Sequence, residues 1–140
     1  MILLDTNVLS ELIRREPNEG VVGWLDSLDA SEVATTAITA AELLYGAARL
    51  PRGRRKQRLS QAIDELIEED LDGRVEPFDV TAAAHYAALV SDRDALGRPI
   101  SVADAQIAAI ARKLRATLAT RNTDDFENTG IDLVDPWKSR

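Results

Sequence analysis

Residues 1–12 read MILLDTNVLSEL, a short apolar run that stops abruptly at an acid, a hydroxyl and an amide. Because the run is apolar and polar residues follow it, it predicts a short buried strand over residues 2–5. An amphipathic stretch begins at Val8 and predicts a helix. The chain therefore opens with a strand that ends at Asp5 and leads into a helix, and Asp5-Thr6-Asn7 occupies the turn between them.

Short strands and helices alternate along the rest of the sequence as well. Apolar runs predict further strands at 32–36, 74–78, 117–120 and 131–134. Helical spacing of apolar residues predicts helices at 8–14, 18–28, 40–50, 54–70, 82–96 and 102–114. The alternation predicts an α/β fold, a three-layer sandwich with a short, mostly parallel sheet flanked by helices. Residues 1–140 are expected to form a single domain, and Pro77 is expected to place its strand near an edge or an end of the sheet.

The composition is that of an ordinary globular protein without thiol chemistry. Hydrophobic residues make up 45% of the 140 residues and charged residues 29%, which is enough apolar material for a sizeable core. The chain has no cysteine, which excludes disulfides and thiolate metal sites. It has no apolar run long enough for a signal peptide or a membrane span, so a cytoplasmic location and no membrane partner are expected.

The charge is acidic overall but unevenly distributed. The net charge of −7 argues against binding of nucleic acid by the whole surface, which usually requires a basic domain. Residues 49–58, RLPRGRRKQR, nevertheless contain six basic side chains, and residues 64–72, DELIEEDLD, contain six acids. The simplest interpretation of each run is a solvated helix face. The alternative for residues 49–58 is a basic patch that steers a polyanion to one place.

Three acids follow or precede predicted strands at positions where a parallel sheet binds ligands. Asp5 ends the first strand, Glu42 follows the second strand, and Asp104 opens the helix that precedes the fourth strand. Ligands of open parallel sheets bind beyond the carboxyl ends of the strands, so these three carboxylates are expected to converge there. His85 is the only histidine, and its place in an alanine-rich helix indicates a structural or surface role.

Helix capping is the competing interpretation of these acids. Ser or Thr followed three residues later by an acid forms a capping box, and three segments approximate that pattern: Thr39–Glu42, Ser101–Asp104 and Asn122–Asp125. A cap contributes only about 1 kcal/mol, whereas two carboxylates about 4 Å apart repel by roughly 4 kcal/mol at an effective dielectric constant of 20. Convergence of the three acids would therefore indicate a hard divalent cation, Mg²⁺ or Mn²⁺, which prefers carboxylate and water oxygens.

Four sequence blocks, in order, resemble the PIN-domain ribonucleases, and among these the VapC and FitB-like toxins of bacterial toxin–antitoxin pairs. The blocks are MILLDTNVLSEL, AITAAELLYG, ISVADAQIAAIA and LATRNTDDF, and a DPW follows near the C-terminus. The resemblance implies Mg²⁺- or Mn²⁺-dependent cleavage of RNA, with Asp5, Glu42 and Asp104 as the metal-binding acids.

The resemblance also implies a set of partners. A homodimer is expected, together with a cognate antitoxin that blocks the site while bound and that forms a larger complex with the toxin. Operator DNA would be contacted through the antitoxin. The family often has a fourth acid where this chain has Asn122, so the alternatives are that Asp124 or Asp125 substitutes or that Asn122 holds a metal-bound water.

The leading hypothesis from the sequence is a ribonuclease that attacks a phosphodiester with a metal-activated water. In this hypothesis Thr6 and Asn7 cap the first helix and hold Asp5, Thr120 orients a water or a phosphate, and the basic run 49–58 holds RNA near a dimer groove. A haloacid-dehalogenase-type phosphohydrolase is a second hypothesis, although Asn7 stands where that chemistry usually needs an acid. A third is a non-catalytic dimeric module whose acidic pocket docks a partner's arginine.

Overall fold

A parallel sheet of five strands forms the centre of the molecule. The computed structural model describes residues 1–138, and within them β1 (Ile2–Leu4) lies between β2 (Val33–Thr36) and β4 (Thr117–Ala119). The edges are β3 (Val75–Glu76), which pairs with β2, and β5 (Asp132–Val134), which pairs with β4. All four pairings are parallel, so the strand order is β3-β2-β1-β4-β5.

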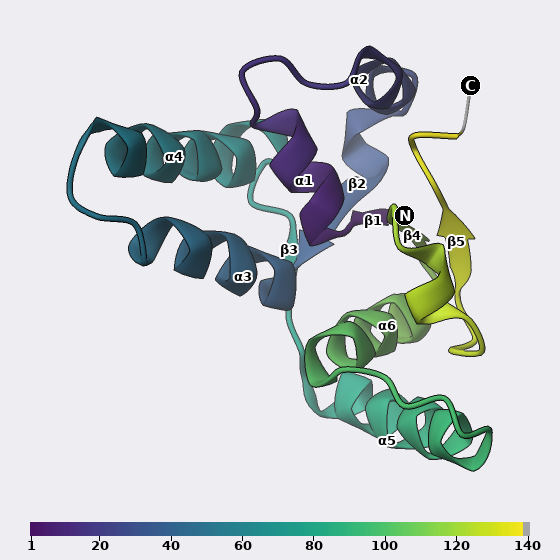
Figure 1. Ribbon diagram of the computed structural model, residues 1–140. Helices are drawn as coiled ribbons and strands as arrows, with labels where there is room; N and C mark the ends of the chain where they lie inside the picture. The colour runs from purple at the N-terminus through teal and green to yellow at the C-terminus, as the bar shows by residue number, and fades with distance from the viewer. Residues whose placement is uncertain (139–140) are drawn as a thin grey trace.

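Six α-helices cover the two faces of this sheet, which confirms the expected α/β sandwich (Figure 1). On one side lie α1 (Thr6–Leu12), α2 (Glu19–Asp26), α3 (Ala37–Ala48) and α4 (Arg54–Glu65). On the other side α5 (Val80–Ala95) and α6 (Val102–Leu114) pack against each other. Shorter turns complete the chain, with 3-10 helices at Ala30–Glu32 and Thr123–Phe126 and a π-helical segment at Leu66–Asp70.

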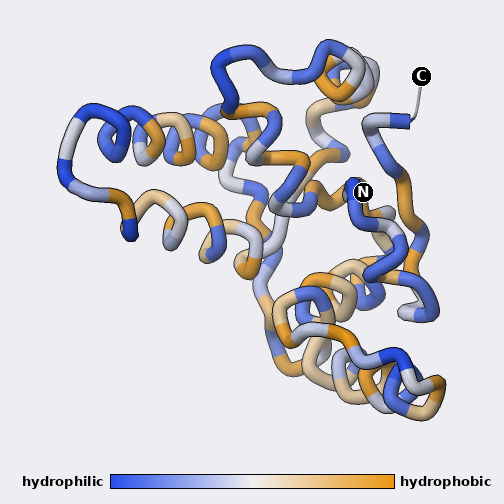
Figure 2. The backbone as a smooth tube through the Cα atoms, in the orientation of Figure 1, coloured by the Kyte–Doolittle hydropathy of each residue, from blue (hydrophilic) through white to orange (hydrophobic). Residues whose placement is uncertain are grey.

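Successive strand residues point into two different hydrophobic cores. Leu3 packs in the core under α5 and α6, whereas Leu4 packs in the core under α1, α2 and α4. In the neighbouring strand, Leu118 packs in the same core as Leu3 and Ala119 packs in the same core as Leu4. Because side chains alternate across a strand and both faces of this sheet are covered, all three positions of the central strand β1 are apolar. Figure 2 shows this as hydrophobic colours in the strands and hydrophilic colours at the tip of the α3–α4 pair.

Most predicted elements are confirmed, with shifts at their ends. The helix expected over 54–70 is α4 followed by the π-helical segment, so the backbone hydrogen-bond pattern changes at Leu66. Pro77 directly follows β3, which is an edge strand as predicted. Within residues 1–138, no helix has the length and apolar character needed to cross a membrane.

Candidate active site

Asp5 stands at the carboxyl end of the central strand and also caps the helix that follows. Its Oδ1 accepts a 2.8 Å hydrogen bond from the backbone N–H of Thr6, and its side chain is only 5% exposed. Asn7 Nδ2 lies 3.2 Å from Asp5 Oδ2, to which it donates. Asp5 is therefore the cap itself, and the expectation that Thr6 and Asn7 cap α1 is wrong. The expectation that Asn7 helps to hold Asp5 in place is confirmed.

The hydroxyl of Thr120 connects Asp5 to the end of the neighbouring strand β4. Thr120 Oγ1 donates a 2.8 Å hydrogen bond to Asp5 Oδ2. The same oxygen accepts from Asn7 Nδ2 at 3.2 Å and from the backbone N–H of Asn122 at 3.1 Å. Thr120 is fully buried, so this one hydroxyl fixes the Asp5 carboxylate relative to the loop after β4.

Glu42 reaches the same region from α3. Its Oε1 accepts a 2.8 Å hydrogen bond from the hydroxyl of Thr6, the residue that follows Asp5. The side chain is otherwise exposed. Glu42 does not close a capping box with Thr39, because α3 begins one turn earlier and its cap is Thr36, whose hydroxyl accepts from the backbone N–H of Thr39. The predicted start of this helix, at residue 40, is therefore too late. The interpretation of Glu42 as part of a capping box is wrong for the same reason.

Asp104 lies in the first turn of α6, beside the acids already described. Its backbone N–H donates to the hydroxyl of Ser101, so Ser101 is the predicted cap of α6. Partial burial raises the pKa of Asp104, the hydrogen bond with Ser101 opposes that rise, and the charges of Asp5, Asp125 and Glu42 raise it further. The charges of Asp5 and Glu42 therefore reach Asp104, as expected for acids gathered at one edge of the sheet.

The electrostatics of Asp5 lead to the same conclusion. Burial raises the pKa of Asp5, and the hydrogen bonds from Thr120, Thr6 and Asn7 partly offset the rise. The nearby charge of Glu42 raises the pKa again. A buried carboxylate that is surrounded by other carboxylates holds its negative charge at a cost, and a bound cation would remove that cost.

The loop after β4 adds a fourth carboxylate to this cluster, and it is Asp125. The charge of Asp125 raises the pKa of Asp104, whereas Asn122 contributes its backbone N–H to Thr120. Asp124 lies on the same exposed turn and is not among the charges that raise this pKa. The third predicted capping box is wrong, because within the described residues no side-chain bond of Asn122 caps the 3-10 helix. The sequence motif DDF contained this acid but did not distinguish Asp124 from Asp125.

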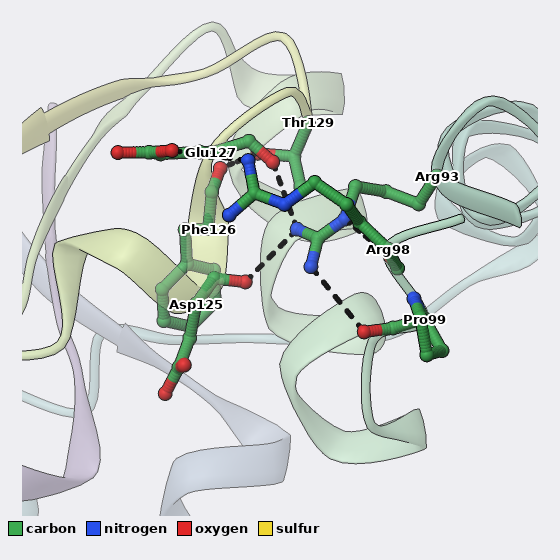
Figure 3. A network of polar contacts seen from close by, with 7 residues as sticks. All are labelled: Arg93, Arg98, Pro99, Asp125, Phe126, Glu127 and Thr129. Atoms are coloured by element: carbon green, nitrogen blue, oxygen red, sulfur yellow. Dashed lines mark hydrogen bonds and ion pairs between the residues drawn. The ribbon is translucent and has the colours of Figure 1, made fainter. Parts of the chain in front are cut away.

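A buried arginine joins the segments that carry Asp104 and Asp125 (Figure 3). Arg93, at the end of α5, is 4% exposed. Its guanidinium donates to the carbonyl of Arg98 at 2.7 Å, just before α6, and to the carbonyls of Asp125 at 3.0 Å and Glu127 at 2.8 Å. All of these acceptors are backbone oxygens, so Arg93 ties two loops together without pairing with an acid. Nothing in its sequence context predicted this role.

The chemistry of the acid cluster fits a hard divalent cation. Its members supply carboxylate oxygens from four separate segments, which is the donor type that Mg²⁺ and Mn²⁺ prefer. As the side chains stand in residues 1–138, no three His, Cys, Asp or Glu groups are near enough to one point to bind a single ion directly. Repulsion between carboxylates extends beyond coordination distance, so the charges of Asp5, Asp125 and Glu42 can act on Asp104 although the acids do not meet at one ion-binding point.

Comparison with known proteins identifies the family. The sequence profile of the PIN domain matches residues 2–132. The chain belongs to the PIN-domain family. Over 137 residues this PIN domain is 44% identical to the toxin FitB of Neisseria gonorrhoeae, with 98% of this chain and 99% of that protein covered. It is 40% identical over 138 residues to the VapC ribonuclease Y4jK of Sinorhizobium fredii, with 99% of each chain covered.

A solved structure confirms the PIN-domain fold over the whole chain. The structure of FitAB bound to an IR36 DNA fragment superimposes with a TM-score of 0.92 at 43% identity, and covers 100% of this chain and 98% of that one. The acid cluster described above lies at the carboxyl ends of β1 and β4 in this PIN domain. The predicted resemblance to PIN-domain toxins is confirmed.

Proposed function

We propose that this chain is a Mg²⁺- or Mn²⁺-dependent endoribonuclease and the toxin of a toxin–antitoxin pair. The observation that supports it most directly is that the charges of Asp5 and Glu42 both act on Asp104, and that of Glu42 on Asp5, beside the sheet of a PIN domain. Relatives of similar length are named as a toxin and as a ribonuclease, and they match along nearly the full chain. These observations support hydrolysis of an RNA phosphodiester.

In this proposal Asp5, Glu42 and Asp104 hold the cation, and Asp125 completes the carboxylate set. When bound, the cation supplies an activated water and stabilises charge on the phosphoryl oxygens. The chain's own contribution is to fix the ligands: Thr120 orients Asp5, and the Thr6 hydroxyl holds Glu42. Such outer contacts tune metal ligands, and their loss commonly costs about 10- to 100-fold in metal affinity or activity.

The proposal extends to partners. The FitAB and VapBC structures similar to this chain are toxin–antitoxin complexes, and three of them are bound to DNA. We infer that a cognate antitoxin binds this chain and blocks the acid cluster, that the toxin is a homodimer in the complex, and that DNA is contacted through the antitoxin. The cytoplasm is the compartment where such a complex would meet both its operator and RNA.

Cleavage of RNA by the purified full chain tests the proposal. Activity with Mg²⁺ or Mn²⁺ should disappear with EDTA and in Asp5→Asn and Asp104→Asn, and should persist in Asp92→Asn, which changes an exposed acid in the last turn of α5. A thermal shift with Mn²⁺ provides a readout that does not need a substrate, because a ligand of the folded state stabilises it. Mn²⁺ should raise the melting temperature of the parent and of Asp92→Asn only. RNA cleavage that survives EDTA, or a parent with neither cleavage nor a Mn²⁺ shift, would contradict the proposal.

A further inference from the structure

A groove of about 410 Å³ lies between α1, α3 and α4, directly beside the acid cluster. The hydrogen-bonded pair Thr6 and Glu42 forms the part of its lining next to Asp5. Its floor is apolar and includes the buried side chains of Leu43 and Ile63. Its volume is in the range of pockets that hold drug-sized ligands, so it accommodates about one or two nucleotides of a single strand and not a duplex.

Arginines line this groove, although the chain as a whole carries a net charge of −7. Arg14 and Arg15 come from the turn that follows α1, and Arg55 and Arg58 come from α4. Arg14 is committed in part, because its guanidinium pairs with the buried carboxylate of Glu11 at 3.3 Å. Within residues 1–138 no carboxylate forms an ion pair with the other three arginines, all of which are exposed.

The structure divides the basic run 49–58 into two groups with different positions. Arg55 and Arg58, three residues apart on α4, share the face that lines the groove. Arg49 instead lies over the Tyr45 ring at 6.0 Å. Lys56 donates to the carbonyl of Ala48, and Arg52 lines a separate hollow on the outer side of α4. Of the six basic residues, Arg55 and Arg58 are therefore the two that line the groove with Glu42.

We propose that this groove binds a single-stranded segment of the RNA substrate and leads it into the acid cluster. Phosphates would lie against Arg15, Arg55 and Arg58, and bases would cover the apolar floor. Basic grooves with an apolar surface for the bases are the general means of binding single strands without sequence preference. The inference rests on the proposed ribonuclease function and assigns a location to substrate binding. Because exposed charges are screened beyond about 8 Å at physiological salt, arginines beside the cluster offset its repulsion of RNA better than a distant patch.

Gly46 provides a way to fill the groove without disturbing the fold. It lies in α3 on the groove lining, and a Cβ atom added there would have no neighbour within 4 Å. In Gly46→Leu the new side chain should therefore occupy the groove. The change should not disturb α3, because leucine is a better helix former than glycine. Gly23, in the exposed part of α2, has equally open surroundings and gives the matched control Gly23→Leu.

The test is binding of a fluorescent single-stranded oligouridylate by the full chain in EDTA, at several salt concentrations. The double variant Arg55→Gln/Arg58→Gln should bind about tenfold more weakly at about 0.15 M salt, which is the loss expected for two phosphate contacts. Gly46→Leu should weaken binding by a similar factor of roughly ten, because its side chain fills the groove. The double variant should also reduce the slope of log K against log salt by about 1.4. The charge-matched double variant Arg52→Gln/Arg54→Gln and Gly23→Leu should bind within about twofold of the parent. In Mg²⁺ the groove variants should raise KM for cleavage and leave kcat unchanged.

Each remaining outcome would overturn the inference in a distinguishable way. Equal losses in the two arginine double variants, with Gly46→Leu unchanged, would assign RNA binding to overall charge while the ribonuclease function stands. Displacement of the oligouridylate by polyglutamate at equal charge concentration would assign the groove to an acidic protein segment. A parent that neither cleaves nor binds RNA would overturn the proposed function and this inference together.

Discussion

The hydroxyl of Thr120 donates a 2.8 Å hydrogen bond to Oδ2 of Asp5 across 115 residues of sequence. The contact is possible because Asp5 and Thr120 follow the ends of two neighbouring parallel strands, β1 and β4. Asp5 has an unusual environment as a result: it is buried among other acids, and it is stabilised there by neutral donors from the turn and from Thr120.

Replacing Thr120 by Val should destabilise the protein and weaken metal binding. The change removes the buried donor to Asp5 and leaves the partly buried Asn122 N–H and Asn7 Nδ2 without this acceptor. Unfolding in urea should show a loss of about 1–3 kcal/mol. Thr120→Ser keeps the hydroxyl and should retain most of the stability and the Mn²⁺ affinity. If both variants lose equally, the hydroxyl is not the important group.

Asp104→Asn should stabilise the protein at neutral pH in the absence of metal. The pKa of Asp104 is raised in the folded protein, so folding favours the protonated form and ionisation at higher pH costs stability. This cost develops as pH rises from about 4, the ordinary pKa of aspartate, through the raised folded pKa. Urea unfolding in EDTA should therefore show the variant as more stable at pH 7 and equal to the parent near pH 3. The exposed-acid variant Asp92→Asn should match the parent within about 0.5 kcal/mol at pH 7.

The two adjacent acids Asp124 and Asp125 should behave differently when neutralised. The charge of Asp125 acts on Asp104, whereas the charge of Asp124 does not contribute to the shift of either buried acid. Asp125→Asn should therefore lower Mn²⁺ affinity by about tenfold or more. Asp124→Asn should leave it unchanged in the same calorimetric titration. The reverse pattern would assign the fourth ligand to Asp124.

Loss of the Arg93 guanidinium should be among the most destabilising single changes in the chain. Arg93→Met keeps the aliphatic packing but leaves the carbonyls of Arg98, Asp125 and Glu127 without their donor. We expect a loss of about 3 kcal/mol or more. Arg98→Met is the matched control, because Arg98 forms a half-exposed ion pair with Glu127 at 3.1 Å, and such pairs contribute about 0–1 kcal/mol. Similar losses in both variants would contradict the assignment.

The central strand of the sheet could be predicted because it is buried on both of its faces. Leu3 and Leu4 face opposite cores, and a strand covered on both faces is apolar throughout, which makes it visible as an uninterrupted apolar run. The helix Val102–Leu114 was placed correctly because Ser101 caps it and its apolar side follows the helical period. The start of α3 was misplaced because Thr36 and Thr39 are both good caps, and only the backbone geometry shows which one accepts.

The site was predictable to the extent that it depends on strand ends. Asp5, Glu42 and Asp104 were identified because parallel strands place their carboxyl ends at one edge of the sheet. Asp125 and Arg93 were not assigned, since their positions depend on the path of the loops at 97–101 and 120–130, which have no periodic pattern. The basic run 49–58 is evident in the sequence and its role in holding RNA stays a prediction, but only the structure shows that Arg55 and Arg58 line the groove beside α1.

The position of β1 at the centre of the sheet has a consequence for synthesis. Its pairing with β4 joins two strands that are far apart in the sequence, so a nascent chain that has reached residue 114 still lacks the strand that positions Asp5. Thr120 and Asp125 are also translated after that point. We therefore expect the acid cluster to assemble only after residues 117–125 have been made and have left the ribosome.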